Sequence, residues 1–139
     1  MEVVSVTGNN VGLLQNFIDN IGESAGTFRY FAKRDVSVIK QHIATLLFTE
    51  NDKPVAYGHL EREGDEVWLG VCVLPGVKGK GYGKQMMNAL IQKAEANNVK
   101  KISLTVDKVN KAAVQLYEKL GFKKVAETDS YFKYEFITR

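Results

Sequence analysis

The stretch from Trp68 to Gln92 constrains the fold of this chain more than any other. Residues 68–74 are apolar and rich in β-branched side chains, which predicts a buried strand. Residues 75–83 form a loop with four glycines and two lysines. The next residues place apolar side chains at helical spacing, at Met86, Met87, Leu90, Ile91 and Ala94. A strand, a glycine-rich loop and a helix are therefore expected in succession.

This succession suits the binding of a phosphate by backbone groups. The first N–H groups of a helix lack an internal partner, and the helix dipole adds partial positive charge there. Glycine lets those groups approach an anion because it carries no Cβ. We expect a diphosphate on residues 79–84, although a flexible turn without a ligand would have a similar composition.

Two familiar nucleotide-binding loops do not match this stretch. The loop lacks the Gly-Lys-Ser/Thr ending of a P-loop, so no hydroxyl is placed for Mg²⁺ and nucleotide hydrolysis is not expected. The dinucleotide pattern G-x-G-x-x-G also fails, because its third glycine position holds Lys84 or Met86.

The residues Lys78-Gly-Lys-Gly-Tyr-Gly83 resemble the acyl-CoA pyrophosphate loop of the GNAT acyltransferases (Gcn5-related N-acetyltransferases), whose pattern is Arg/Gln-x-x-Gly-x-Gly/Ala. Lys78 replaces the usual Arg or Gln. A second segment, from Asn110 to Phe122, resembles the family pattern Asn-x-x-Ala-x-x-Leu-Tyr-x-x-x-Gly-Phe. The two motifs occur in the family's order, and the resemblance covers residues 44–137 well and the first 43 weakly.

The resemblance and the hydrophobic pattern together predict one domain over residues 1–139. Its architecture would be the mixed α/β (α+β) fold of the GNAT family, with helices on both faces of a central sheet. Asn10 and Asp35 are expected to cap helices. Helices are predicted at 11–21, 36–43, from 83 or 84 to about 97, and at 111–119; strands are predicted at 45–50, 54–61, 66–74, 101–106, 122–127 and 131–137, with an edge strand at 2–6.

The resemblance implies acetyl-CoA as cofactor, and it assigns residues to its binding. Tyr117 matches the family tyrosine that acts as general acid to the CoA sulfur, although a core aromatic residue is the alternative. Asn110 could cap its helix or bind the pantetheine arm. Cys72 could be a nucleophile, but a small buried thiol is favoured because no base is near it in sequence. The residues expected to bind the cofactor are Val71, Cys72, Val73, Lys78, Gly79, Lys80, Gly81, Tyr82, Gly83, Lys84, Asn110 and Tyr117.

The general base is left open by the sequence. Glu66 stands where the family often keeps a glutamate, although one step of register would turn it away. His59 has a suitable unperturbed pKa and shares a strand face with Tyr57 and Glu61. His42 is a third candidate, and ordered water is a fourth route.

The acceptor is expected to be the primary amine of a small molecule. Arg29 could pair with a phosphate or carboxylate, while Tyr30 and Phe31 could stack on a flat ring beside His59. The segment faintly resembles GNAT members that acylate amino sugars on nucleotide carriers. An amino acid, a polyamine or a peptide stays open as the acceptor, and so does a non-catalytic module that senses acyl-CoA.

The composition limits the partners of the chain. The 19 basic and 16 acidic residues give a net charge of +3, too balanced to predict nucleic-acid binding. No apolar run is long enough to span a membrane, and the N-terminus does not have the pattern of a signal peptide. One cysteine excludes an internal disulfide and favours the cytoplasm. Two histidines far apart in sequence predict no metal site. A monomer or a homodimer is expected.

Overall fold

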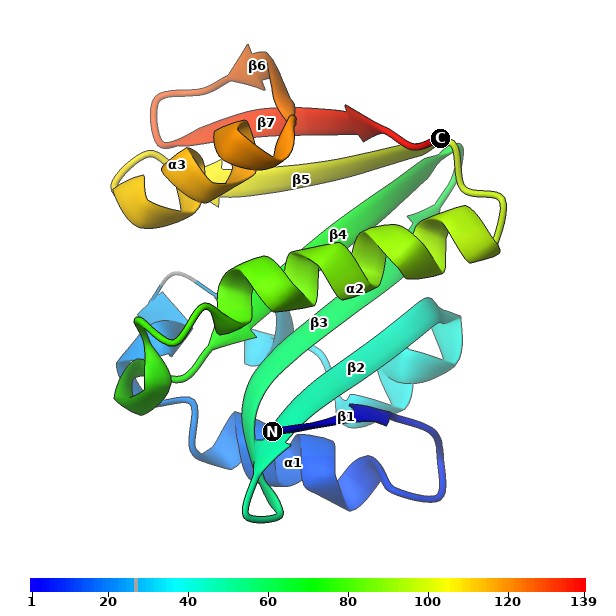
Figure 1. The fold of residues 1–139 in the computed structure, drawn as a ribbon, viewed down its shortest axis with the longest axis vertical. Helices are drawn as coiled ribbons and strands as arrows, with labels where there is room; N and C mark the ends of the chain where they lie inside the picture. Colours follow the sequence, from blue (N-terminus) through cyan, green and yellow to red (C-terminus); the bar gives the residue numbers. More distant parts are fainter. Residues whose placement is uncertain (27) are drawn as a thin grey trace.

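The computed structural model describes residues 1–26 and 28–139. These residues form a seven-stranded sheet with the order β1-β2-β3-β4-β5-β7-β6 (Figure 1). The strands are β1 (Glu2–Ser5), β2 (His42–Glu50), β3 (Lys53–Glu63), β4 (Glu66–Val73), β5 (Lys101–Asp107), β6 (Lys123–Glu127) and β7 (Tyr131–Ile137). All neighbouring strands are antiparallel except β4 and β5. The mixed sheet that the sequence predicts is confirmed.

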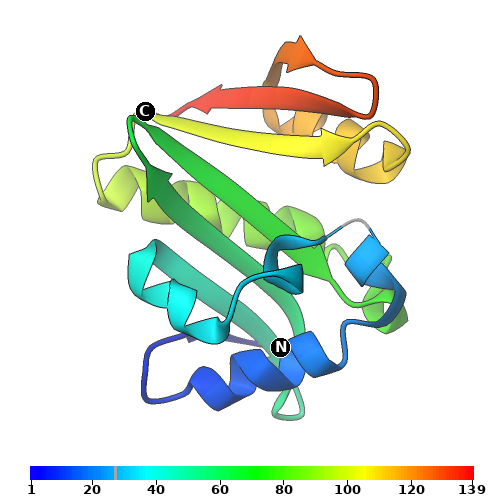
Figure 2. The same cartoon turned by 180° about the vertical axis from the view of Figure 1, so that it is seen from behind.

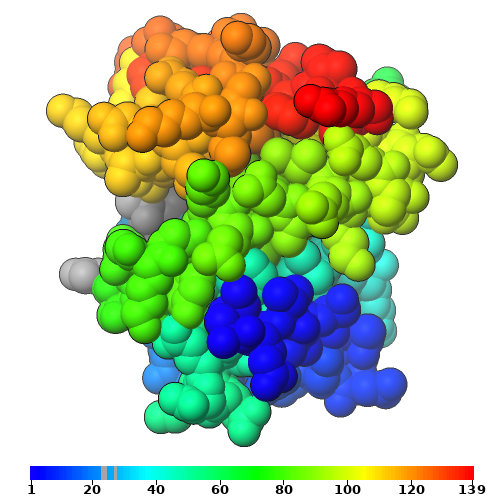
Figure 3. Space-filling view, in the orientation of Figure 1, coloured from blue at the N-terminus to red at the C-terminus, as the bar shows by residue number. Residues whose placement is uncertain are grey.

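Helices cover both faces of the sheet, as expected. Helix α2 (Tyr82–Ala96) and helix α3 (Lys111–Leu120) pack on one face, where the larger hydrophobic core lies (Figure 1). Helix α1 (Val11–Asp19) and the 3₁₀ helices η2 (Tyr30–Ala32) and η3 (Val36–Gln41) lie on the other face (Figure 2). In the space-filling view, α2 separates the N-terminal part from the C-terminal strands (Figure 3). None of the helices among the described residues is both long and apolar enough to span a membrane.

The pairing of β4 with β5 is brief. The two parallel strands share one register position, Trp68 opposite Ser103, and then diverge toward the carboxyl end of β4 (Figures 1 and 2). On its other side β4 pairs with β3 along its whole length, so that Tyr57 lies opposite Cys72 and His59 opposite Gly70. Opposed residues share a face of the sheet. The divergence opens the sheet beside β4, at the point where the chain enters the glycine-rich loop.

Two local predictions are wrong. The helix predicted at 36–43 is the 3₁₀ helix η3, and β2 already begins at His42. Asn10 does not cap α1 with its side chain; its Oδ1 accepts from the Thr7 N–H at 2.7 Å instead. Strand β6 forms the edge of the sheet, and β7 lies next to it. Asp35 does cap η3, where its carboxylate accepts from the Ser37 N–H at 2.6 Å.

Candidate active site

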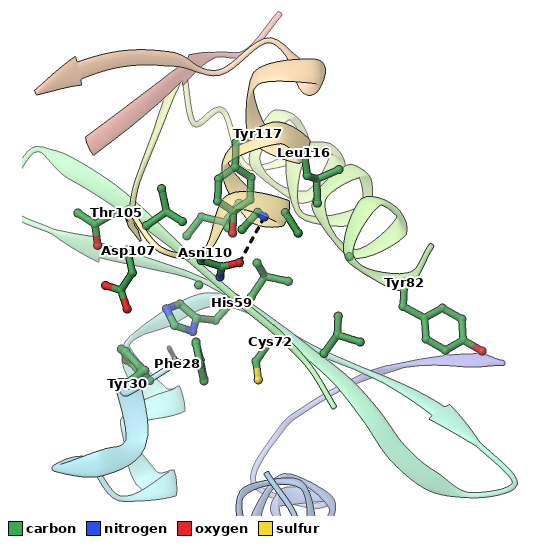
Figure 4. A pocket seen from close by; sticks show the side chains of 18 of the residues that line it. Phe28, Tyr30, His59, Cys72, Tyr82, Thr105, Asp107, Asn110, Leu116 and Tyr117 are labelled. Carbon is green, nitrogen blue, oxygen red and sulfur yellow. Dashed lines mark hydrogen bonds between the residues drawn. The ribbon is translucent and has the colours of Figure 1, made fainter. Parts of the chain in front are cut away.

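A cavity of about 800 Å³ follows the opening between β4 and β5. Its size is within the range of small-molecule and cofactor sites. One end lies at the glycine-rich loop, the middle between β4 and α3, and the other end beneath the segment that carries η2 (Figure 4). The cavity therefore joins the loop, the predicted acid and the predicted acceptor segment in one space.

The loop leads into an uncapped start of α2. Gly79 and Gly81 have φ values of +90° and +80°, which favour glycine, and Gly81 is the N-cap residue. No side chain of the described residues caps this helix. The first N–H groups of α2 thus lack a protein acceptor, at the positive end of the helix dipole. Lys78, Gly79, Gly81, Tyr82, Gly83 and Lys84 all line the cavity.

Lys80 differs from its neighbours because it does not line the cavity. Its Nζ lies 3.2 Å from a carboxylate oxygen of Glu50. The Tyr82 hydroxyl donates to the same carboxylate and points away from the cavity (Figure 4). The hydrogen bond from Tyr82 and then the hydrogen bond from Lys80 lower the pKa of Glu50. Glu50 ties the loop to the end of β2, and no sequence motif links these distant positions.

The second motif places Tyr117 and Asn110 on the opposite wall. The Asn110 Oδ1 accepts from the Ala113 N–H at 3.3 Å, which caps α3 (Figure 4). Gly121, with a φ of +101°, ends the helix. Tyr117 is only 7% exposed, and its hydroxyl points into the space between α3 and β4 (Figure 4). Burial, and then the nearby Cys72 thiol, raise the pKa of Tyr117, so it keeps its proton at neutral pH.

Strand β4 supplies the floor of the cavity with Val71, Cys72 and Val73. Cys72 is 6% exposed and also belongs to the smaller hydrophobic core, together with Phe17 and Tyr57. This apolar setting is that of a structural thiol rather than an activated nucleophile.

His59 lines the acceptor end of the cavity, and His42 packs against it. The rings of His42 and His59 stack with centroids 4.5 Å apart, and Tyr30 lies 4.3 Å from His59. His59 Nδ1 is 2.7 Å from the Tyr57 hydroxyl. The ring of His59 covers Gly70, where a Cβ would come within 2.4 Å of it. Burial lowers the pKa of His59 well below its usual value, and electrostatic repulsion of a protonated ring by His42 and Arg34 lowers it further.

Folding brings these histidines closer than their sequence separation predicts. Ligand atoms of His42, His59 and Glu61 all lie within 4.8 Å of one another, a set with the donor types of a zinc site. However, the two imidazole planes are only 23° apart, so their in-plane lone pairs do not converge on one point. Both nitrogens of His42 are also hydrogen-bonded, to Tyr30 and Thr45 at 2.8 Å each. The arrangement is a hydrogen-bonded stack rather than a coordination site.

Two other predicted site residues do not line the cavity. Glu66 lies at the start of β4, where its carboxylate is 2.7 Å from Lys133 Nζ and also accepts from Ser103. Phe31 packs against Tyr57, with ring centroids 5.4 Å apart. Glu66 is thus engaged elsewhere as an ion-pair partner, and Phe31 belongs to the packing beneath the acceptor end.

The arginines at the acceptor end both have partners within the protein. Arg29 forms a bidentate pair with Asp107 at the end of β5, with two N–O distances of 3.1 Å. Arg34 lies 4.4 Å above the Tyr30 ring and donates to the Tyr30 carbonyl oxygen. Both arginines line the cavity, but the guanidinium group of each is already engaged by another residue of the protein.

Comparison with known proteins shows that the sequence is similar to acetyltransferases. The family model described as "Acetyltransferase (GNAT) family" matches residues 14–122. A ribosomal protein bS18-alanine N-acetyltransferase of Haemophilus ducreyi is 30% identical over 88 residues, which are 63% of this chain and 61% of that protein. The Escherichia coli K12 enzyme of the same name is 28% identical over 81% of this chain and 77% of its own.

Solved structures agree on the fold. An acetyltransferase of the GNAT family from Streptococcus pneumoniae superposes with a TM-score of 0.83 at 18% identity, covering 99% of each chain. The putative acetyltransferase yncA from Salmonella typhimurium, solved with acetyl-CoA, superposes with a TM-score of 0.79 at 16% identity, covering 100% of this chain and 94% of that one. With its two motifs on either side of one cavity, the chain belongs to the GNAT family of acetyltransferases.

Proposed function

We propose that this protein transfers the acetyl group of acetyl-CoA to a primary amine. The observation that carries the proposal is the shape of the cavity, which has an uncapped, glycine-rich helix start at one end and a buried, protonated tyrosine at its middle. The relatives named for acetylating a ribosomal protein alanine, and the neighbour solved with acetyl-CoA, support the same reaction class.

The residues present fit coenzyme A. The backbone N–H groups of residues 79–84 would hold its diphosphate, and Lys78 and Lys84 add positive charge at the same end. The gap beside Val71–Val73 is an elongated, largely apolar slot that would accept the pantetheine arm, with Asn110 on its far wall. When bound, acetyl-CoA supplies an acyl group activated as a thioester. Lys80 is paired with Glu50, so it would stabilise the conformation of the loop rather than contact the phosphates.

Tyr117 is the proposed general acid. Its raised pKa keeps a proton on the hydroxyl, and that proton is available to the sulfur that leaves as the acyl group moves. His59 is a poor base for the amine, because its buried ring resists protonation. Ordered water is therefore the proposed route for the amine's proton, and His59 contributes a wall of the acceptor end.

Two kinds of acceptor fit the cavity. The first is a small-molecule amine such as an amino sugar, which could stack on Phe28, Tyr30 or Trp68 along the lining. The second is the N-terminal amine of a peptide or protein, and the relatives are named for acetylating an alanine of a ribosomal protein. The internal pairing of Arg29 and Arg34 gives less support to a sugar carried on a nucleotide diphosphate.

An assay of CoA release tests the proposal. Purified protein with acetyl-CoA is offered amino sugars, amino acids, polyamines and a short peptide with N-terminal alanine, and free thiol is measured against a control without amine. We expect amine-dependent release with at least one class and acetylation of that amine by mass spectrometry. Tight acetyl-CoA binding without turnover of any amine would support a sensing module instead, and absence of binding would contradict both functions.

A further inference from the structure

Glu61 is a buried carboxylate at the acceptor end of the cavity. It is 9% exposed and lines the cavity from β3, two residues beyond His59 on the same strand face. A carboxylate in such a position costs several kcal/mol unless a cation or a set of donors compensates its charge. The groups that surround Glu61 therefore indicate which kind of ligand would compensate its charge.

No cation in the part of the chain that the structure describes pairs with Glu61. Among the described residues, neither Glu61 nor Glu63, the next residue on the same face of β3, takes part in an ion pair. Arg29 is committed to Asp107, and Arg34 to the Tyr30 carbonyl and ring. The charges of Arg29 and Asp107 cancel. The remaining charged groups that line this end are the carboxylates of Glu61 and Glu63 and the guanidinium of Arg34.

The adjacent histidines do not supply the missing charge. Burial lowers the pKa of His42 to about 4, so its ring is neutral at pH 7, and the ring of His59 is neutral for the same reason. Neutral rings are what allow the two imidazoles to stack at 4.5 Å without repulsion. Glu61 thus faces neutral aromatic rings and open cavity.

A chain of hydrogen bonds holds this arrangement in place. His42 bridges the Thr45 hydroxyl and the Tyr30 hydroxyl at 2.8 Å each. Tyr30 in turn lies against Glu61, whose charge and hydrogen bond contribute, after burial, to raising the pKa of Tyr30. A tyrosine that keeps its proton can donate to Glu61, which orients the carboxylate but leaves its charge uncompensated.

We infer that Glu61 binds the ammonium group of the acceptor, with Glu63 continuing the negative potential outward. The acceptor would then be a cationic amine with no anionic group beside its reacting nitrogen. A peptide N-terminus, an amino acid amide or an amino sugar without an acidic group satisfies this condition, whereas a free α-amino acid or a phosphorylated amino sugar does not. This inference rests on the proposed acetyl transfer and narrows its acceptor class.

Two matched pairs of amines test the inference, namely alaninamide against alanine and glucosamine against glucosamine 6-phosphate. Within each pair the carbon skeleton is the same and the anionic group differs. Because a nearby anion also raises the pKa of the amine, the rates are compared per unprotonated amine. We expect kcat/KM to be at least about tenfold higher for the member without the anion, because a like charge near Glu61 is repelled. Equal or reversed preference in both pairs would overturn the inference.

Substitution of the carboxylate gives the residue-level test. Glu61→Gln keeps the shape and removes the charge, so the KM for alaninamide should rise about tenfold or more and the advantage over alanine should shrink. The KM for acetyl-CoA should not change. Glu135→Gln, the same change on β7 outside the cavity lining, is the matched control. Glu61→Asp retains the charge, and it should restore part of the discrimination.

Several results would count against the inference in distinguishable ways. If the wild-type protein acetylates these amines and Glu61→Gln has an unchanged amine KM, the inference fails while the proposed function stands. If acetyl-CoA binds but no cationic amine is bound or acetylated, both fail. Stoichiometric zinc in the purified protein, released by Glu61→Gln, would also overturn it, because Glu61 would then be a metal ligand. If the Glu61→Gln variant does not fold, the inference is still tested by the preference of the wild-type protein within the two amine pairs.

Discussion

Burial acts in opposite directions on the two predicted catalytic side chains and leaves both neutral. It raises the pKa of Tyr117 and lowers that of His59, because a low-dielectric setting disfavours the charged form of either group. A neutral tyrosine still has a proton to give, which suits an acid. A neutral histidine that resists protonation is a weak base. The same physical cause thus supports one assignment and weakens the other.

Replacing Tyr117 by phenylalanine tests the acid directly. The Tyr117→Phe variant loses the proton donor but keeps the ring, so kcat should fall by about a hundredfold or more while the Kd for acetyl-CoA stays nearly unchanged. Steady-state kinetics and calorimetric titration measure the two quantities. Tyr134→Phe removes the hydroxyl of another buried tyrosine, which donates to Glu118 outside the cavity lining, and it should leave kcat unaltered. Equal turnover in both variants would exclude Tyr117 from the mechanism.

At the scale of elements, the start of α2 governs the cofactor end. The left-handed Gly81 turns the chain into the helix, and the amides that follow have no side-chain cap. This local arrangement depends on only a few residues, which is why the sequence reveals it. The divergence of β4 from β5 depends instead on the whole sheet, and it supplies the slot that continues the loop.

Gly81→Ala should weaken acetyl-CoA binding. A Cβ at a φ of +80° costs about 1–2 kcal/mol, and the loop can escape this strain by leaving its binding conformation. We expect the Kd for acetyl-CoA, measured by calorimetry, to rise about tenfold. Gly76→Ala lies in the same loop, without a positive φ and with no atom within 4 Å of the added Cβ, and it should bind normally. An unchanged Kd in Gly81→Ala would contradict the loop assignment.

At the scale of the whole molecule, the buried histidines make stability depend on pH. Their pKa values in the folded state lie below the unfolded value of 6.5, to about 4 for His42 and well below for His59. The unfolded chain therefore binds protons first, so the stabilisation is complete above about pH 6.5 and is lost as the pH falls toward the folded pKa values.

We expect the free energy of unfolding in urea to drop by roughly 2 kcal/mol between pH 7 and pH 5, allowing for the partial exposure of His42. The chain has only these two histidines. The double variant His42→Gln and His59→Gln should consequently show an almost flat profile over this interval. A wild-type profile that is equally flat would show that the rings are accessible to protons in the folded state.

Elements with strong local signals could be predicted from the sequence. The loop glycines, the apolar spacing of α2, the Asn110 cap and the Gly121 stop all act through neighbours in the chain, so their pattern is visible without a fold. The two motifs were sufficient to predict the family and the mixed sheet, both of which are confirmed. The helix cap predicted at Asn10 failed because a competing local hydrogen bond, from the Thr7 N–H three residues earlier in the chain, engages its side-chain oxygen.

Which charged side chains are free to bind a ligand depends on contacts between distant segments of the chain. Arg29 meets Asp107 from 78 residues away, Lys80 meets Glu50, and Glu66 meets Lys133, and none of these pairs has a signature in the sequence. The sheet register and the packing of η2 leave Glu61 buried without a cation beside neutral rings. Charge compensation depends on distance in space, whereas a sequence records only distance along the chain.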